Sequence, residues 1–414
     1  MLFFPCCKAR RLLALALMCC AWPGYAQTRI SADDAVALAL SQPHVRQELD
    51  AGVDIARSDV LAARIWPNPE LVLEQERGDA GPLGDARETT AVLSQTFELG
   101  GRRGLRVDAA EQGVRAAELG AGYERARLRA DVLRAYSAVV AGERRRQAHA
   151  RTADGLRELS AIAGKRQRAG DLSGYDSRRI AQASAQAQAR ASQADAEARA
   201  ARARLAGWIG DAALTAELDS SPPLPPIPVL PDAVRSAELD VLHAQRLHAQ
   251  AQARAERRLA LPVTVGVGTK RVEEAGMSDD LMVFEVGVPL PLFDRNQAGR
   301  ARTAAEAERA DAHYQRALLQ ARSRRTAALE EAQHLSASAR DLFDNAVPEA
   351  SRLTEIARAS FSEGELDLVG LLDAFDAETD VVDQALEQQA RALDALLELQ
   401  LSVPLAVPAN DPTH

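Results

Sequence analysis

The chain has 414 residues, a formal net charge of −9, 47% hydrophobic residues and only 4% aromatic residues. The acidic balance argues against a nucleic-acid partner, because binding a phosphate backbone requires concentrated Lys and Arg. Alanine dominates the apolar fraction and contributes little burial per residue, so the composition favours long, closely packed helices over a thick globular core.

The first 26 residues are typical of a secretory signal peptide. Basic residues precede an apolar run from Leu12 to Trp22, and Gly24-Tyr25-Ala26 provides a small-x-Ala cleavage site. A membrane anchor, or a lipid-modified start at Cys19 or Cys20, is an alternative interpretation. No later segment resembles a membrane-spanning helix, and the mature chain would contain no cysteine, since all four lie in this segment (Cys6, Cys7, Cys19 and Cys20).

Residues 27–221 are expected to form a first structural unit. A helix capped by Ser31 should run to about Ile65, where Trp66-Pro67 ends it. Short amphipathic strands are predicted at about 70–77 and 90–99, and Gly100-Gly101 breaks the second strand. A proline-free helical hairpin then covers about 104–209, with its turn near Gly170.

A proline-rich linker at 222–231 separates this unit from a second one at 232–403. The second unit follows the same plan: a helix, strands at about 263–271 and 281–290, and a helical hairpin at about 298–401. Pro348 is expected to end the first long helix of this hairpin. Residues 404–414 read as a flexible tail.

The two units are offset by about 195 residues throughout, which indicates an internal duplication. Pro67 matches Pro262, and Gly170-Asp171-Leu172 matches Gly364-Glu365-Leu366. Both units contain an elbow where a short strand gives way to a very long helix. The second elbow is the clearer one: Met282, Phe284, Val286 and Val288 alternate with Glu285 and Gly287 before two prolines and a helix.

Four short strands cannot close a barrel within one chain, and an open sheet edge cannot lie in lipid. If the strands cross a membrane, several copies must therefore share one sheet. Three copies would give about twelve strands, enough to enclose a lumen.

The elbow segments FELGGRRGLR (Phe97–Arg106) and PLPLFDRNQAG (Pro289–Gly299), with the signal peptide and the repeat, resemble the TolC-like outer-membrane efflux proteins. The elbows look most like the heavy-metal efflux (CzcC/CusC-like) branch. The resemblance implies a mainly α fold with membrane β: a homotrimer whose 12-stranded β-barrel continues as a long periplasmic α-helical barrel. It also implies a passive outer-membrane exit duct in Gram-negative bacteria, served by a periplasmic adaptor (membrane fusion) protein and an inner-membrane RND pump.

Three sets of candidate functional residues follow. In proteins of this kind the hairpin turns meet the adaptor, so the docking tips would be Gly170, Asp171, Leu172, Gly364, Glu365, Leu366, Val369, Gly370 and Leu371. An alternative is that Leu368, Val369 and Leu371 only pack within the hairpin. Asp373, Asp376, Asp380 and Asp383 share one helix face by their spacing. The first three would form a cation-favouring gate, or the row is merely a solvated face. The strand-to-helix elbows are Gly100, Gly101, Pro289, Pro291, Phe293, Asp294, Asn296 and Gly299.

The sequence shows no catalytic constellation, cofactor motif or metal site, so we expect no enzyme, no cofactor and no bound metal. His243 and His248 are five residues apart and share a helix face poorly. Two other functions stay open: the outlet of a multidrug or type I secretion exporter, and a periplasmic coiled-coil scaffold. The scaffold would not need four alternating strands.

Overall fold

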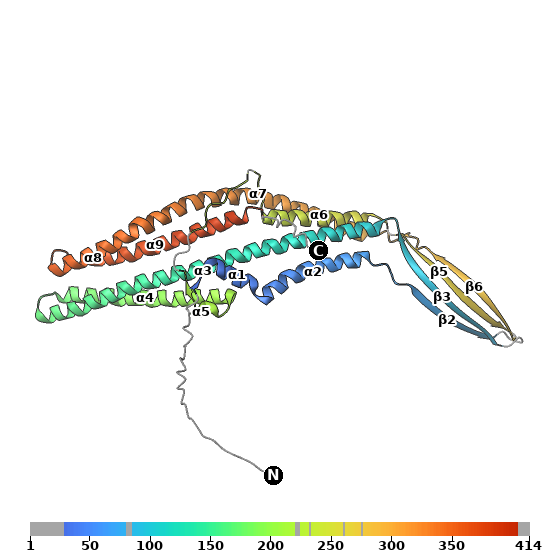
Figure 1. The fold of residues 1–414 in the computed structure, drawn as a ribbon, viewed down its shortest axis with the longest axis horizontal. Helices are drawn as coiled ribbons and strands as arrows, with labels where there is room; N and C mark the ends of the chain where they lie inside the picture. The colour runs from blue at the N-terminus through green and yellow to red at the C-terminus, as the bar shows by residue number, and fades with distance from the viewer. Residues whose placement is uncertain are drawn as a thin grey trace, which may run out of the picture.

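The computed structural model describes residues 29–79, 85–219, 224–231, 233–259, 261–274 and 276–404. The expected signal peptide, the start of the linker and nearly all of the tail lie outside these residues. The described chain forms a long helical body with a four-stranded sheet at one end, set at an angle to the helices (Figure 1).

The N-terminal region contains β1 (Arg29–Ile30), α1 (Ala32–Ser41) and α2 (Pro43–Arg64). Ser31 and Asp34 cap α1 reciprocally, as a capping box. The prediction of one helix from Ser31 to Ile65 is wrong, because the chain breaks at Gln42. Pro43 follows it, and the residue before a proline is driven out of helical geometry; Gln42 has ψ 130°.

The sheet has the order β2-β3-β5-β6 and is antiparallel throughout: β2 (Glu70–Asp79), β3 (Asp85–Leu99), β5 (Leu261–Glu274) and β6 (Met277–Gly287). Each unit contributes one hairpin, and the β3–β5 ladder joins the two hairpins. Three strands run further than predicted, whereas β6 ends at Gly287, just before Pro289. Within the described chain β2 and β6 each pair on one side only, so the sheet has two free edges.

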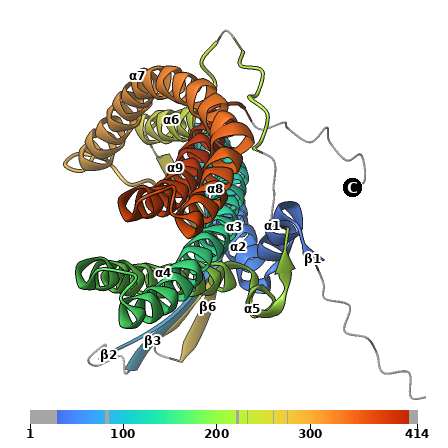
Figure 2. The same cartoon turned by 90° about the vertical axis from the view of Figure 1, so that its left-hand side faces the viewer.

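The helical body consists mainly of two long hairpins. The first pairs α3 (Arg102–Ala169) with α4 (Gly174–Ile209). The second pairs α9 (Leu368–Leu401) with a composite helix formed by α7 (Gln297–Asp341), a π-helical segment (Leu342–Ala346) and α8 (Val347–Glu363). Seen end-on, the two hairpins lie as neighbouring pairs (Figure 2).

The prediction that Pro348 ends a helix is wrong. Pro348 lies in the first turn of α8, and the helical backbone continues into it from the π-helical segment. A wide π turn accommodates a residue that lacks an N–H donor, so the composite helix stays unbroken while its hydrogen-bond pattern changes.

A small module packs against the middle of α3. It contains β1, α1, α5 (Ala212–Thr215) and β4 (Glu217–Leu218), which pairs in parallel with β1. Tyr136 of α3 is buried in its hydrophobic core and donates a hydrogen bond to the Ile30 carbonyl at 2.8 Å. This contact ties the start of the described chain to the long helix.

Small residues allow the helices to approach closely. Most buried hydrophobic positions in the helices are alanines, and a Cβ on Gly142 of α3 would lie only 3.2 Å from Ala198 Cα of α4. α6 (Ala237–Arg257) runs beside α3 and α7. Among the helices described, none combines the length and apolar character needed to cross a bilayer.

Candidate functional sites: sheet, elbows and hairpin tips

One face of the sheet is apolar and strongly exposed. The register aligns Leu71, Leu93, Val267 and Phe284 in one row across all four strands, and the next row contains Leu73, Ala91 and Met282. Phe284 is 75% exposed and Leu93 52%. The predicted alternation in β6 is confirmed, since Met282, Phe284 and Val286 share this face. A hydrophobic surface of this kind needs an apolar partner.

The opposite face carries most of the acidic residues of the strands and is buried only near its centre. Val92 on this face is only 7% exposed, and small residues such as Gly266 and Gly268 face it across the ladder. Among the described strand residues on this face, one is basic: Lys270, which forms an ion pair with Glu88. The acidic residues on this face are Glu70, Glu74, Glu76, Glu88, Glu98, Glu274, Asp279 and Glu285.

Left-handed backbone forms both elbows. Gly100 and Gly101 have φ angles of 93° and 75°, and α3 starts directly after them. At the second elbow Asn296, with φ 58°, precedes α7. Asparagine is among the few non-glycine residues that adopt this conformation readily. Asp294 Oδ1 accepts a hydrogen bond from the Asn296 amide at 2.8 Å and fixes the turn.

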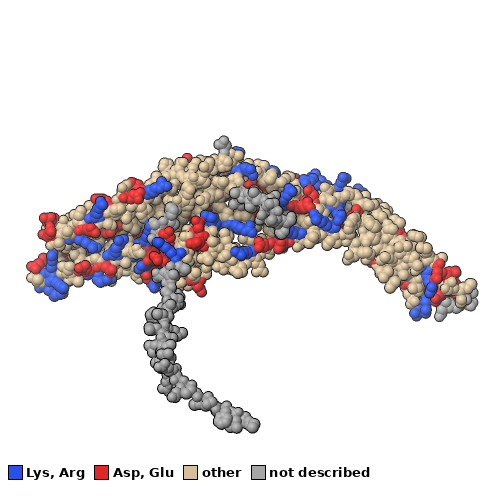
Figure 3. All heavy atoms as spheres, viewed as in Figure 1, with Lys and Arg blue, Asp and Glu red and all other residues tan. Residues whose placement is uncertain are grey.

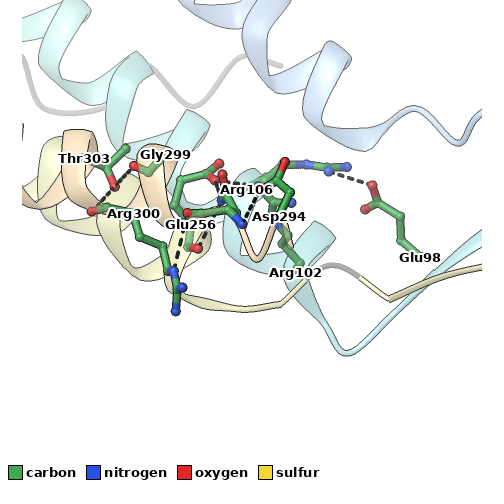
Figure 4. A network of polar contacts seen from close by, with 9 residues as sticks. Glu98, Arg102, Arg106, Glu256, Asp294, Gly299, Arg300 and Thr303 are labelled. Atoms are coloured by element: carbon green, nitrogen blue, oxygen red, sulfur yellow. Dashed lines mark hydrogen bonds and ion pairs between the residues drawn. The ribbon is translucent and has the colours of Figure 1, made fainter. Parts of the chain in front are cut away.

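A polar network joins the two elbows (Figure 4). Glu256, at the end of α6, binds Arg102 of the first elbow at 2.6 Å and accepts a hydrogen bond from the Asn296 side chain of the second. Burial raises the pKa of Glu256, but the hydrogen bonds from Arg102 and Asn296 lower it by more, so it lies below the ordinary 4.5. Arg106 binds Glu98 at 2.8 Å nearby. Sequence reasoning missed Glu256, because its partners lie far away in the chain.

The remaining elbow residues shape the turn. Pro289 and Pro291 follow the end of β6, where a ladder donor is no longer required. A Cβ on Gly299 would collide with the Asn296 side chain, so the first turn of α7 requires a glycine. Phe293 is 91% exposed in the single chain.

The two hairpin tips have the same construction. Gly170 and Gly364 end α3 and α8 in left-handed geometry, with φ 89° and 83°. Three residues later Ser173 and Asp367 cap the returning helices. The predicted correspondence between the two turns thus extends to backbone conformation. Asp171 and Glu365 are exposed, whereas Leu172 and Leu366 are half-buried.

The apolar residues at the second tip differ in burial. Leu371 is buried in a cluster with Phe375 and Leu156, so it packs within the helical body. Val369 is 42% exposed. A Cβ on Gly370 would lie 2.8 Å from Leu366 Cδ1, so this glycine makes room for the tip leucine.

The acidic residues of α9 line grooves between α4 and α9, above α3. Asp373 and Asp376 line one groove and Asp380 the next. The α4 wall is basic, and Arg190 binds Asp376 at 3.0 Å. One carboxylate of the row is therefore paired with an arginine of α4, a contact that the sequence spacing did not reveal.

Asp383, one turn further along α9, connects the two hairpins. Its carboxylate lies 2.8 Å from Arg145 Nε and 3.0 Å from His149 Nε2, both on α3. Burial raises the pKa of Asp383, but the hydrogen bonds from His149 and Arg145 lower it by more. The pKa therefore lies below the ordinary 3.8. Among the described residues no group of His, Cys, Asp and Glu is placed to hold a metal ion.

Known proteins with similar sequences and structures were found. The chain is 26% identical over 331 residues to the cobalt–zinc–cadmium resistance protein CzcC of Cupriavidus metallidurans, covering 78% of this chain and 77% of the relative. It is 35% identical over 276 residues to the nickel and cobalt resistance protein CnrC of the same organism, covering 64% and 63%. The Campylobacter jejuni CmeC outer membrane channel superimposes with a TM-score of 0.72 at 12% identity, covering 97% of this chain and 93% of that one. No family model matches.

The chain has the fold of the TolC-like outer-membrane channels, and its sequence is similar to those of heavy-metal resistance proteins. The expected TolC-like fold is confirmed, and so is the resemblance to the heavy-metal branch. In this TolC-like protein the elbows join the sheet to the helical body, and the tips lie at the far end of that body (Figure 1).

Proposed function

We propose that this TolC-like protein is the outer-membrane channel of a tripartite efflux system and a passive exit duct for heavy-metal cations. The observation that carries the proposal is the two-faced sheet with two free edges. Its apolar face suits lipid, its acidic face suits a water-filled passage for cations, and its edges require further copies.

Three copies supply the missing strand partners. If β6 of one copy pairs with β2 of the next, twelve strands close with every apolar face outward. The long hairpins continue the wall into the periplasm, where an adaptor protein and an inner-membrane RND pump would deliver the cargo. A duct of this kind binds no cofactor and catalyses no reaction.

The acidic lining favours cations, because fixed carboxylates raise the local concentration of counter-ions. The test replaces Glu74, Glu76 and Glu285 by Gln and measures ion selectivity of purified trimers in planar bilayers. We expect the preference for cations over anions to fall at least several-fold. Equal selectivity of variant and wild type would contradict the cation duct. A second test measures the metal and drug sensitivity of a strain that lacks the protein: sensitivity to drugs but not to cobalt, zinc, cadmium or nickel would also contradict it.

The hairpin tips are the proposed adaptor-docking surface. Val369 is an exposed apolar side chain beside a rigid turn, so Val369→Arg should weaken docking without loss of the trimer. Val229→Arg, a matched change at an exposed linker position, should leave export intact. Copurification of the adaptor and metal resistance are the readouts. Undiminished adaptor capture by Val369→Arg would exclude this part of the tip.

A further inference from the structure

The chain segments at the elbow end of the sheet are strongly basic. Leu99–Arg106, Arg257–Leu261 and Val288–Arg300 contain seven arginines, and Asp294 is their one acidic residue. These segments are neighbours in space, because Glu256 binds both Arg102 and Asn296. The figures agree: charged atoms gather where the helices end, and the sheet beyond them shows little charge until its far tip (Figure 3).

The internal network uses three of these arginines. Arg102 and Arg106 bind Glu256 and Glu98, and Arg103 donates to the Arg64 carbonyl and lies 4.8 Å above the Trp66 ring. The other four are exposed and have no carboxylate partner among the described residues: Arg257, Arg258, Arg295 and Arg300. We call these four the basic collar. Arg295 and Arg300 make only local hydrogen bonds, to the Pro291 and Asn296 carbonyls.

The far end of the sheet has the opposite balance. Lys270 and Arg271 are bonded there to Glu88 and Asp280. Further carboxylates surround them in β2, β5 and β6, at Glu76, Glu273, Glu274 and Asp279. Arg77 and Arg87 are also exposed at this end, but the carboxylates outnumber the basic residues. Net positive charge is therefore concentrated at the other boundary of the apolar face, next to the helical body.

Exposed apolar side chains lie directly beside the basic collar. Phe293 is 91% exposed, and Leu290 and Leu292 are also exposed. They follow the end of β6 in the chain. Apolar side chains followed by unpaired arginines reproduce the order of acyl chain and headgroup at a membrane surface.

We infer that the basic collar binds the phosphate groups of anionic phospholipids in the periplasmic leaflet, while Phe293 and its neighbours lie among the adjoining acyl chains. Guanidinium groups bind phosphate with paired hydrogen bonds, and each basic residue near an anionic surface adds attraction. The collar would hold the sheet at a fixed depth and keep an annulus of anionic lipid around the elbows. The inference rests on the proposed membrane channel.

The test uses purified full-length mature protein in its assembled form. Native mass spectrometry would count phosphatidylglycerol and phosphatidylcholine molecules retained by wild type, by Arg258→Gln/Arg300→Gln and by Arg257→Gln/Arg295→Gln. Arg77→Gln/Arg87→Gln, which removes two exposed arginines from the far end of the same sheet, is the matched control. Inorganic phosphate is titrated as a competitor.

We expect the affinity for phosphatidylglycerol to fall about fivefold for each collar arginine removed, with no change in the control and no effect on phosphatidylcholine. High salt should weaken the wild-type preference. Equal phosphatidylglycerol retention by wild type and both collar variants would overturn the inference, as would an equal loss in the control. Inorganic phosphate that bound as tightly as the lipid would show a free-anion site instead and would also overturn it. If the protein formed no membrane-embedded trimer, the proposed function would be contradicted. If it formed a trimer that did not prefer phosphatidylglycerol, only this inference would be contradicted.

Discussion

At the scale of single residues, Glu256 is the side chain that fixes both elbows. Glu256→Gln removes the charge that Arg102 pairs with, and the half-buried guanidinium loses its partner. We expect a loss of about 1–3 kcal/mol in stability, seen as a lower dissociation temperature of the trimer. Glu308→Gln, at an exposed site of α7 with no ion pair in the described chain, is the control. Unchanged stability of Glu256→Gln would contradict the role of the network.

The same group predicts a pH dependence. The folded pKa of Glu256 is lowered, so its contribution is complete above the unfolded value near 4.5 and disappears as the pH falls through the folded value. The trimer should therefore lose stability only below about pH 4.5 from this source. Thermal melts at several pH values check this: the difference between wild type and Glu256→Gln should be constant from neutral pH to about pH 5 and shrink below it. A difference that grew on acidification would have the wrong sign.

Asp383 provides the corresponding link between the hairpins. Asp383→Asn at neutral pH should loosen the α3–α9 contact, because the acceptor for both Arg145 and His149 is weakened. We expect a loss of about 1 kcal/mol and faster hydrogen exchange in α9. Asp373→Asn, which breaks no ion pair within the described residues, should change neither measurement. Equal exchange rates in the two variants would show that the link contributes nothing.

At the scale of elements, close helix contact depends on where a glycine lies. Gly142 and Gly120 are both inside α3, but a Cβ on Gly142 would press on the backbone of α4, whereas one on Gly120 would meet nothing within 4 Å. Gly120→Ala should therefore stabilise the protein by up to about 1 kcal/mol. Gly142→Ala should destabilise it by about 1 kcal/mol, because the helices must separate. Paired thermal melts compare the two, and an equal gain in both would contradict the tight α3–α4 contact.

The elements that local chemistry controls could be predicted from the sequence. At both tips a glycine ends one helix and a cap residue starts the next. Apolar alternation identified the exposed apolar side of β6. Helix boundaries were predicted wrongly at two prolines, where the neighbouring backbone decides whether a helix ends. Pro43 broke a helix expected to be continuous, and Pro348 did not end one, because the π-helical segment absorbs it. Glu256 escaped prediction because its partners Arg102 and Asn296 are distant in the chain. Asp383 was expected on an acidic helix face, but its partners on α3, more than 200 residues away, were not.

At the scale of the whole molecule, the free edges predict how copies meet. The repeat makes the internal β3–β5 junction the counterpart of a junction between β6 and β2 of neighbouring chains. Leu73→Cys combined with Met282→Cys places two thiols on the same face at opposite edges. A short crosslinker should then produce dimers and trimers on a denaturing gel. The control, Leu73→Cys with Val265→Cys on an interior strand, should give no crosslinked species. Edge pairing would be contradicted if Leu73→Cys crosslinked neither with Met282→Cys nor with Phe284→Cys.

The twofold repeat has a consequence for the origin of the molecule. Each half contains one strand pair, one elbow and one helical hairpin, and the halves meet along a ladder between backbones that depends little on particular side chains. Six copies of a half-length ancestor could therefore have built the same ring before gene fusion. Fusion would halve the number of chains and let the two halves diverge. Among the described residues the π-helical segment occurs in the second half and has no counterpart in α3.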